Sequence, residues 1–131
     1  MMLIYLIGNI MSFPSYLAYF SDFVGGSKQG YKYLADSNLD WGQDIKRLKN
    51  YLEKNQINEF HSVLFGSLDT NYYLKNQIGM PDNQTVEKFE PQKGFYVISA
   101  TTLFDPTGDF TWLQNYKPIK IIGHSVYIYK F

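Results

Sequence analysis

The densest polar stretch of the chain lies at residues 36–44 and has the sequence DSNLDWGQD. It follows a short apolar stretch and precedes an amphipathic one, so we expect it where a strand gives way to a helix. In an open α/β sheet, ligands bind beyond the carboxyl ends of strands, where the next helix offers free N–H groups at its N-terminus. The stretch therefore occupies the place of a binding site.

Three carboxylates recur in this stretch at intervals of four, and one aromatic residue accompanies them. Asp36, Asp40 and Asp44 are suited to a divalent cation or to a hydroxyl-rich ligand, because both are bound well by carboxylate oxygens. Trp41 adds a ring on which a sugar could stack. The candidate ligand-binding residues are Asp36, Ser37, Asn38, Asp40, Trp41, Gln43 and Asp44.

Helix capping is a competing explanation for the same residues. Asp40 with Gln43 three positions later matches a capping box, and Asp44 would fall in the first helical turn, where an anion is favourable. Asp36 and Asn38 are common turn formers. Capping thus accounts for two of the three acids without a ligand.

Other chemistry has few residues to use. The chain has no cysteine, which excludes disulfides, thiolate metal sites and cysteine nucleophiles. Its two histidines are expected to be structural, His61 half-buried in a strand and His124 at a turn or bulge beside Gly123. Asp69 is predicted to cap a short helix. The sequence therefore assigns no catalytic residue, no metal site and no cofactor.

Length and charge narrow the class of protein. With 131 residues the chain is long enough for one domain with its own core. Twelve basic residues balance twelve acidic ones, which argues against nucleic acid as a partner. Aromatic residues make up 18% of the chain, a content that fits a well-packed core, a sugar-contacting surface or a membrane-adjacent one.

The N-terminal segment is apolar and contains no Lys or Arg before Lys28. The missing basic start argues against a cleavable signal peptide. Residues 1–11 are about half of the roughly 20 needed to span a bilayer. They are predicted to be the last turns of a longer apolar helix, followed by an aromatic cluster of the kind found at membrane interfaces. An ordinary core helix is the alternative.

The remaining pattern alternates strands and helices. We divide the chain into an apolar and aromatic segment, residues 1–24, and a soluble α/β domain, residues 25–131. Strands are predicted at 30–35, 60–66 and 94–101, helices at 41–55, 70–77 and 110–116, and a hairpin or one bulged strand at 119–131. This order predicts a single three-layer α/β domain with a largely parallel central sheet, an antiparallel C-terminal edge and an N-terminal apolar helix stub.

Several of these landmarks together resemble a known family. They are PSYLAYF at 14–20, Gly25-Gly26, YLADSNLDWGQD at 33–44, and the later runs FG at 65–66, YY at 72–73, ISAT at 98–101 and GHSVYIY at 123–129. They are similar to the C-terminal soluble part of bacterial polytopic membrane glycosyltransferases, which resemble family 39 enzymes and protein O-mannosyltransferases. The most specific element is the DSNLDWGQD run.

The resemblance implies that the chain works as part of a larger membrane enzyme. Such enzymes use polyprenyl-phosphate sugars as donors, and their catalytic carboxylate lies in an extracytoplasmic loop near the start of the membrane region. No residue here inherits that role. The resemblance implies an accessory, non-catalytic, membrane-associated domain on the extracytoplasmic face, with residues 1–11 as the stub of the last transmembrane helix. Its partners would be the membrane or the membrane-embedded transferase region, with a glycan or acceptor as a further ligand.

Two other hypotheses come from different classes of protein. One is a freestanding carbohydrate-binding module that uses Asp36, Asn38, Asp40 and Trp41. The other is a small metal-dependent enzyme that uses the carboxylates of Asp36, Asp40 and Asp44. The accessory-domain hypothesis leads, because the resemblance spans nearly the whole chain.

Overall fold

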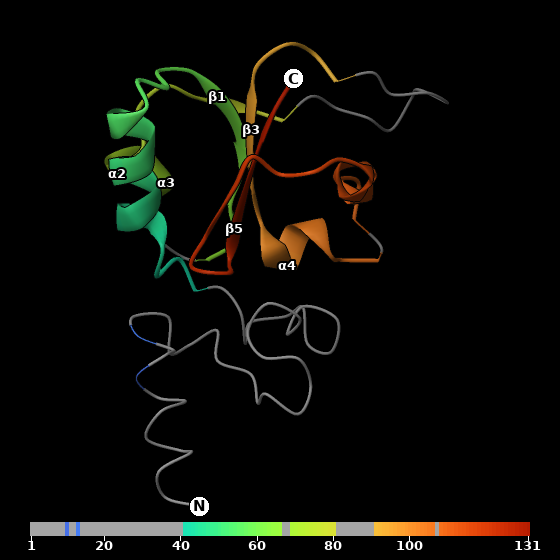
Figure 1. The fold of residues 1–131 in the computed structure, drawn as a ribbon, viewed down its shortest axis with the longest axis horizontal. Helices are drawn as coiled ribbons and strands as arrows, with labels where there is room; N and C mark the ends of the chain where they lie inside the picture. Colours follow the sequence, from blue (N-terminus) through green and yellow to red (C-terminus); the bar gives the residue numbers. More distant parts are fainter. Residues whose placement is uncertain (1–9, 11–12, 14–40, 67–68, 81–90, 107) are drawn as a thin grey trace, which may run out of the picture.

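The computed structural model describes residues 10, 13, 41–66, 69–80, 91–106 and 108–131. Within them the chain forms a five-stranded open sheet with the strand order β2-β1-β3-β5-β4 (Figure 1). In chain order the elements are α2 (Ile45–Lys54), β1 (Phe60–Val63), α3 (Thr70–Tyr73), β2 (Gln77–Gly79), β3 (Phe95–Ser99), α4 (Ala100–Leu103), the 3₁₀ helix η4 (Thr111–Asn115), β4 (Lys120–Ile122) and β5 (Val126–Lys130).

The sheet has a parallel half and an antiparallel half. Strand β1 pairs in parallel with both β2 and β3. Strand β5 runs antiparallel to its two neighbours, β3 and β4. The prediction of an α/β domain with an antiparallel C-terminal edge is confirmed, but the sheet is mixed rather than largely parallel, because the C-terminal hairpin supplies two of its five strands.

Helix α2 is the longest described element and was predicted at 41–55. Ile45, Leu48 and Leu52 recur at helical spacing and are buried, which confirms the predicted apolar face. The helix starts four residues later than expected, at Ile45. At its other end Gln56 has a positive φ of 54°, a left-handed conformation that stops the helix.

The predicted helix at 70–77 is wrong in its second half. Helix α3 ends at Tyr73, and Gln77 begins strand β2. Asn76 between them has a φ of 63°, and an isolated left-handed residue cannot lie inside an α-helix. The Gln77 side chain then donates to Thr70 Oγ1 at 3.1 Å, which ties the new strand back to the short helix. Asp69 caps α3 as predicted, accepting from the Asn71 N–H at 3.0 Å.

The predicted strand at 94–101 also changes conformation before its end. Strand β3 stops at Ser99, and Ala100 begins helix α4. The Ala100 N–H donates to the Ser125 carbonyl at 2.7 Å, just where the partner strand β5 begins, so the chain leaves the sheet there. The predicted helix at 110–116 is the 3₁₀ helix η4, and residues 119–131 form the predicted hairpin.

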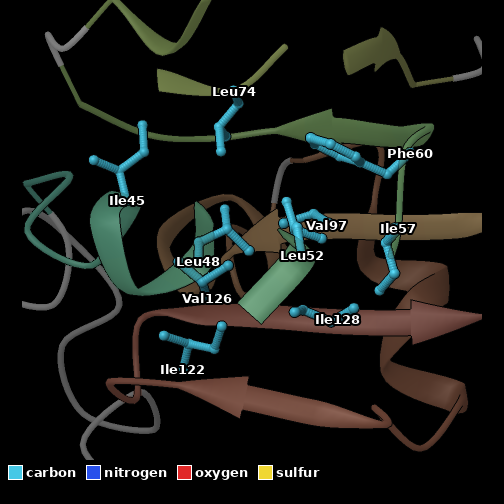
Figure 2. Packing of buried hydrophobic residues seen from close by; sticks show 10 residues of the cluster. All are labelled: Ile45, Leu48, Leu52, Ile57, Phe60, Leu74, Val97, Ile122, Val126 and Ile128. Atoms are coloured by element: carbon cyan, nitrogen blue, oxygen red, sulfur yellow. The ribbon is translucent and has the colours of Figure 1, made fainter. Parts of the chain in front are cut away.

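Helices cover both faces of the sheet, α2 and α3 on one side and α4 with η4 on the other (Figure 1). Under α2 the buried cluster is Ile45, Leu48, Leu52, Ile57, Phe60, Leu74, Val97, Ile122, Val126 and Ile128 (Figure 2). On the opposite face the cluster is Tyr96, Ile98, Ala100, Leu103, Leu113, Tyr127 and Tyr129. Alternate residues of β3 and β5 point to opposite faces, so each strand supplies both clusters.

Aromatic packing dominates the second cluster. The Tyr96 ring meets Trp112 and Phe131 edge to face, with centroids 6.1 and 5.3 Å apart. Phe131 also meets Tyr116 edge to face at 4.8 Å. These are favourable geometries for ring pairs. Core packing therefore uses a large part of the chain's aromatic content, one of the three explanations that composition allowed.

The strand predicted at 30–35 and the N-terminal segment 1–24 lie outside the described residues, apart from Ile10 and Phe13. Within the described part of the chain, no helix is long and apolar enough to cross a membrane.

The buried tyrosines make stability sensitive to alkaline pH. Burial raises the pKa of Tyr96 and Tyr129 above the ordinary value of 10.0. A group whose pKa is raised by folding stabilises the fold below its unfolded pKa and loses that effect as the pH rises, so these residues should promote unfolding above pH 10. We expect the Tyr129→Phe variant to unfold at higher pH than the wild type in a fluorescence-monitored alkaline titration. Tyr72→Phe, at an exposed ring, is the control; equal midpoints for all three proteins would contradict the prediction.

Candidate functional site

Four structural elements meet at one edge of the sheet, the edge at which the parallel strands end. They are the carboxyl ends of β1 and β3, the start of α2, and the turn between β4 and β5, which Figure 1 shows beside the start of α2. A side-chain carbon added at Gly66, beyond β1, would lie 3.2 Å from the Trp41 carbonyl carbon. Ser125, in the turn, bonds both to Asp44 and to the start of α4. The DSNLDWGQD stretch therefore ends at this edge, with Asp44.

This edge contains the topological switch point of the sheet. Strands β1 and β3 are parallel neighbours, but α3 follows β1 on one face and α4 follows β3 on the other. Connections that diverge in this way open a crevice where α/β proteins bind ligands. Here the Phe65 N–H donates across it to the fully buried Ser99 hydroxyl at 2.8 Å. A hydrogen bond within the protein therefore spans the crevice.

The described residues contain only part of the predicted site. Trp41, Gln43 and Asp44 are described, whereas Asp36, Ser37, Asn38 and Asp40 lie outside the described residues. Their relation to Asp44 therefore stays a prediction.

Asp44 is buried, and each of its two carboxylate oxygens has a structural partner. The residue is 2% exposed in the folded chain. One carboxylate oxygen accepts from the Ser125 hydroxyl at 2.7 Å, and the other accepts from Arg47 Nη1 at 2.7 Å. The ion pair with Arg47 joins residues three positions apart and is partly exposed. The hydrogen bond with Ser125 is buried and joins residues 81 positions apart. Asp44 thus fastens the start of α2 to the β4–β5 turn.

Helix capping at this position differs from the prediction. Asp44 itself holds the N-cap position of α2, but its side chain makes no capping bond. The capping box predicted between Asp40 and Gln43 is wrong, since Gln43 Oε1 accepts from the Trp41 N–H at 2.7 Å, ahead of a helix that begins at Ile45. Gly42, with a φ of 79°, turns the chain there, and its carbonyl accepts from Ile45.

The β4–β5 turn is shaped to receive the Asp44 carboxylate. Gly123 and His124 have φ values of 58° and 67°, and the Ser125 N–H donates to the Ile122 carbonyl at 3.1 Å. Positive φ at both central positions is typical of a type I′ hairpin turn. A side-chain carbon at Gly123 would overlap the Asp44 carboxylate. Two features therefore favour glycine at position 123: the left-handed backbone and the lack of room for a side chain.

Both histidines have the structural surroundings that the sequence predicted. His124 lies in the turn just described. His61 is half-buried in β1, with Nδ1 3.0 Å from the Gly79 carbonyl and its ring 4.8 Å from the Tyr96 ring. Among the residues that the structure describes, no three His, Asp or Glu side chains gather as metal ligands would.

Among the candidate residues that the structure describes, Trp41 is the one whose side chain is exposed at this edge. It is 56% exposed, and Phe65, beyond β1, is also exposed. An open indole face can stack on a sugar ring or lie at a membrane interface. Sequence reasoning missed Ser125, Arg47 and Ser99, the partners that hold the edge together. Only Gly123 before His124 hinted at a turn, and nothing linked that turn to Asp44.

No family model, curated protein or solved structure matches this chain. The glycosyltransferase resemblance therefore rests on the sequence landmarks alone.

The contact between Gly123 and Asp44 predicts a large effect of one added methyl group. Gly123→Ala combines a left-handed alanine with displacement of the Asp44 carboxylate from Ser125, and should lower the free energy of unfolding by at least about 2 kcal/mol. Gly79→Ala is the matched control, because nothing lies within 4 Å of its added carbon. Urea unfolding of both variants measures the difference; similar stabilities would show that the turn does not depend on this contact.

Proposed function

We propose that the chain is an accessory, non-catalytic extracytoplasmic domain of a membrane glycosyltransferase that uses polyprenyl-phosphate-linked sugar donors. The observation that carries the proposal is the use of Asp44. It belongs to the run that carries the family resemblance, and both its oxygens hold the fold together. Asp44, the last acid of this run, thus stabilises the fold rather than binding a ligand, as expected of a domain whose catalytic centre lies elsewhere.

The proposal extends to the whole architecture. Residues 25–131 form a three-layer domain, and residues 1–11 are the stub of a transmembrane helix. The helices on both faces of the described sheet support the first statement. The apolar sequence of the segment supports the second.

The edge around Asp44 is the side of the domain that we assign to the membrane region. Trp41 and Phe65 are exposed there, and aromatic side chains are enriched where proteins meet the membrane interface. The partner of this edge is the membrane or the membrane-embedded transferase region.

Fractionation of the source cells tests the proposal. An antibody raised against the 131-residue chain should detect a polypeptide several times larger than 15.3 kDa, confined to membranes and resistant to alkaline carbonate extraction. Protease added outside the cytoplasmic membrane should degrade the epitope. A soluble band near 15.3 kDa, or protection from external protease, would overturn the proposal, as would sugar transfer by the 131-residue chain alone.

A carbohydrate-binding function is the second candidate, favoured by the open face of Trp41. If the indole stacks on a sugar, Trp41→Ala should weaken glycan binding by about fivefold, since stacking on an aromatic ring contributes of the order of 1 kcal/mol. Calorimetric titration of the full chain with oligosaccharides measures this loss. The control is Tyr72→Ala, which removes another exposed ring, on α3. Unchanged affinity in Trp41→Ala would remove the stacking contact.

A further inference from the structure

A cavity of about 220 Å³ opens at the amino end of β1, on the face of the sheet that α2 covers. It lies between the second half of α2, the loop that leads into β1, and the turn between α3 and β2. Its apolar lining consists of Leu52, Ile57, Phe60 and Leu74, which belong to the buried cluster under α2 (Figure 2). Because Phe60 begins β1, whereas Asp44 lies where β1 ends, the cavity is separate from the candidate site described above.

The walls of the cavity are held by hydrogen bonds within the fold. The Gln77 side chain donates to Thr70 Oγ1 at 3.1 Å and accepts from the Ser62 hydroxyl at 3.0 Å, which ties the α3–β2 turn to β1. On the other side, the Ile57 N–H donates to the Leu52 carbonyl at 2.9 Å, which holds the loop against the end of α2. Ligand cavities are usually largely formed before the ligand binds. This cavity meets that condition.

Polar side chains from three segments surround the cavity. Lys49 and Glu53 come from α2, Asn58 comes from the loop into β1, and Lys75 and Asn76 come from the α3–β2 turn. The Lys49 Nζ atom lies 3.9 Å from Glu53 Oε1, and both side chains are partly exposed, so this ion pair is weak. Two lysines against one glutamate give the lining a positive balance of charge.

The mouth of the cavity and its floor differ in chemistry. Lys75, Asn58 and Asn76 are exposed, whereas the apolar lining is buried. Among the residues that the structure describes, no carboxylate pairs with the Lys75 ammonium group, and no side-chain hydrogen bond engages the two asparagines. An ammonium group and two amides can bind the oxygens of one carboxylate or phosphate group. The buried floor suits a hydrocarbon or a ring.

We propose that this cavity binds a small organic anion. Its carboxylate or phosphate group meets Lys75, and an apolar body about the size of one ring lies against Leu52 and Leu74. The volume sets the size, because cavities for drug-sized ligands measure roughly 300–1,000 Å³ and this one is smaller. The positive balance of the lining sets the sign of the charge. The inference does not depend on membrane attachment or on a glycosyltransferase partner.

Calorimetric titration of the 131-residue chain with phenyl phosphate and with benzoate tests the proposal, because each carries an anionic group on a single ring. The comparison compounds are benzyl alcohol, which has the ring without the charge, and inorganic phosphate, which has the charge without the ring. We expect both ring anions to bind at least about fivefold more tightly than either comparison compound, because only they engage the lysine and the apolar floor together.

Variants at three exposed charged positions locate the site. Lys75→Gln should weaken binding of the ring anions by at least about threefold, because it removes the cation and keeps a long polar side chain. Glu53→Gln should strengthen binding, because it removes a carboxylate from the lining and frees Lys49. Lys54→Gln is the matched control, since Lys54 is on α2 but does not line the cavity. It should bind like the wild type at about 0.15 M salt, where distant charges are screened.

Each of the remaining outcomes would overturn the proposal. No binding of either ring anion at millimolar concentration, by a chain whose circular dichroism shows it folded, would show that the cavity is not an anion site. Equal affinity for benzyl alcohol or for inorganic phosphate would show that the charge or the ring is not recognised. Equal losses in Lys75→Gln and Lys54→Gln would place the anion on the basic surface of α2, outside the cavity.

Discussion

The buried bond between Asp44 and Ser125 is the constraint on which the rest of the structure depends. It joins the N-cap residue of α2 to the turn of the C-terminal hairpin, and the two residues lie 81 positions apart in the sequence. A hydrogen bond to a charged group contributes about 1.5–3 kcal/mol, and a buried carboxylate left without its donor costs more than that gain. The carboxylate therefore determines where the hairpin turn can lie relative to α2. Position 123 must be glycine, because a side-chain carbon there would overlap the Asp44 carboxylate.

That constraint explains how a mixed sheet is held as one layer. The parallel strands β2, β1 and β3 come from the middle of the chain, and β5 and β4 come from its end. Helix α2 packs over residues of both halves, with Phe60 and Val97 on one side and Val126 and Ile128 on the other. Asp44 fixes the start of the helix, and the apolar face fixes its rotation. The aromatic cluster on the opposite face needs no such polar anchor, because large rings in edge-to-face contact specify their own packing.

Sequence reasoning succeeded where local signals were strong and failed where distant contacts decided the outcome. The spacing of Ile45, Leu48 and Leu52 was enough to place α2, and Asp69 was enough to cap α3. The change from helix to strand at Asn76 and the exit from the sheet at Ala100 depend on neighbours far along the chain, which periodicity does not show. The candidate site illustrates the same limit. Asp44 was identified as a residue with a special role, but an acid that binds a ligand and one that binds a buried serine look alike until the partner is known.

The use of Asp44 has a consequence for any function of the edge. The Asp44 carboxylate already accepts from Ser125 and Arg47. Turning it toward a sugar or a cation would leave the buried Ser125 hydroxyl without its acceptor and would release the start of α2, so ligand binding there would compete with folding. Recognition at this edge must therefore come from groups that the fold does not consume, and Trp41 is one of them.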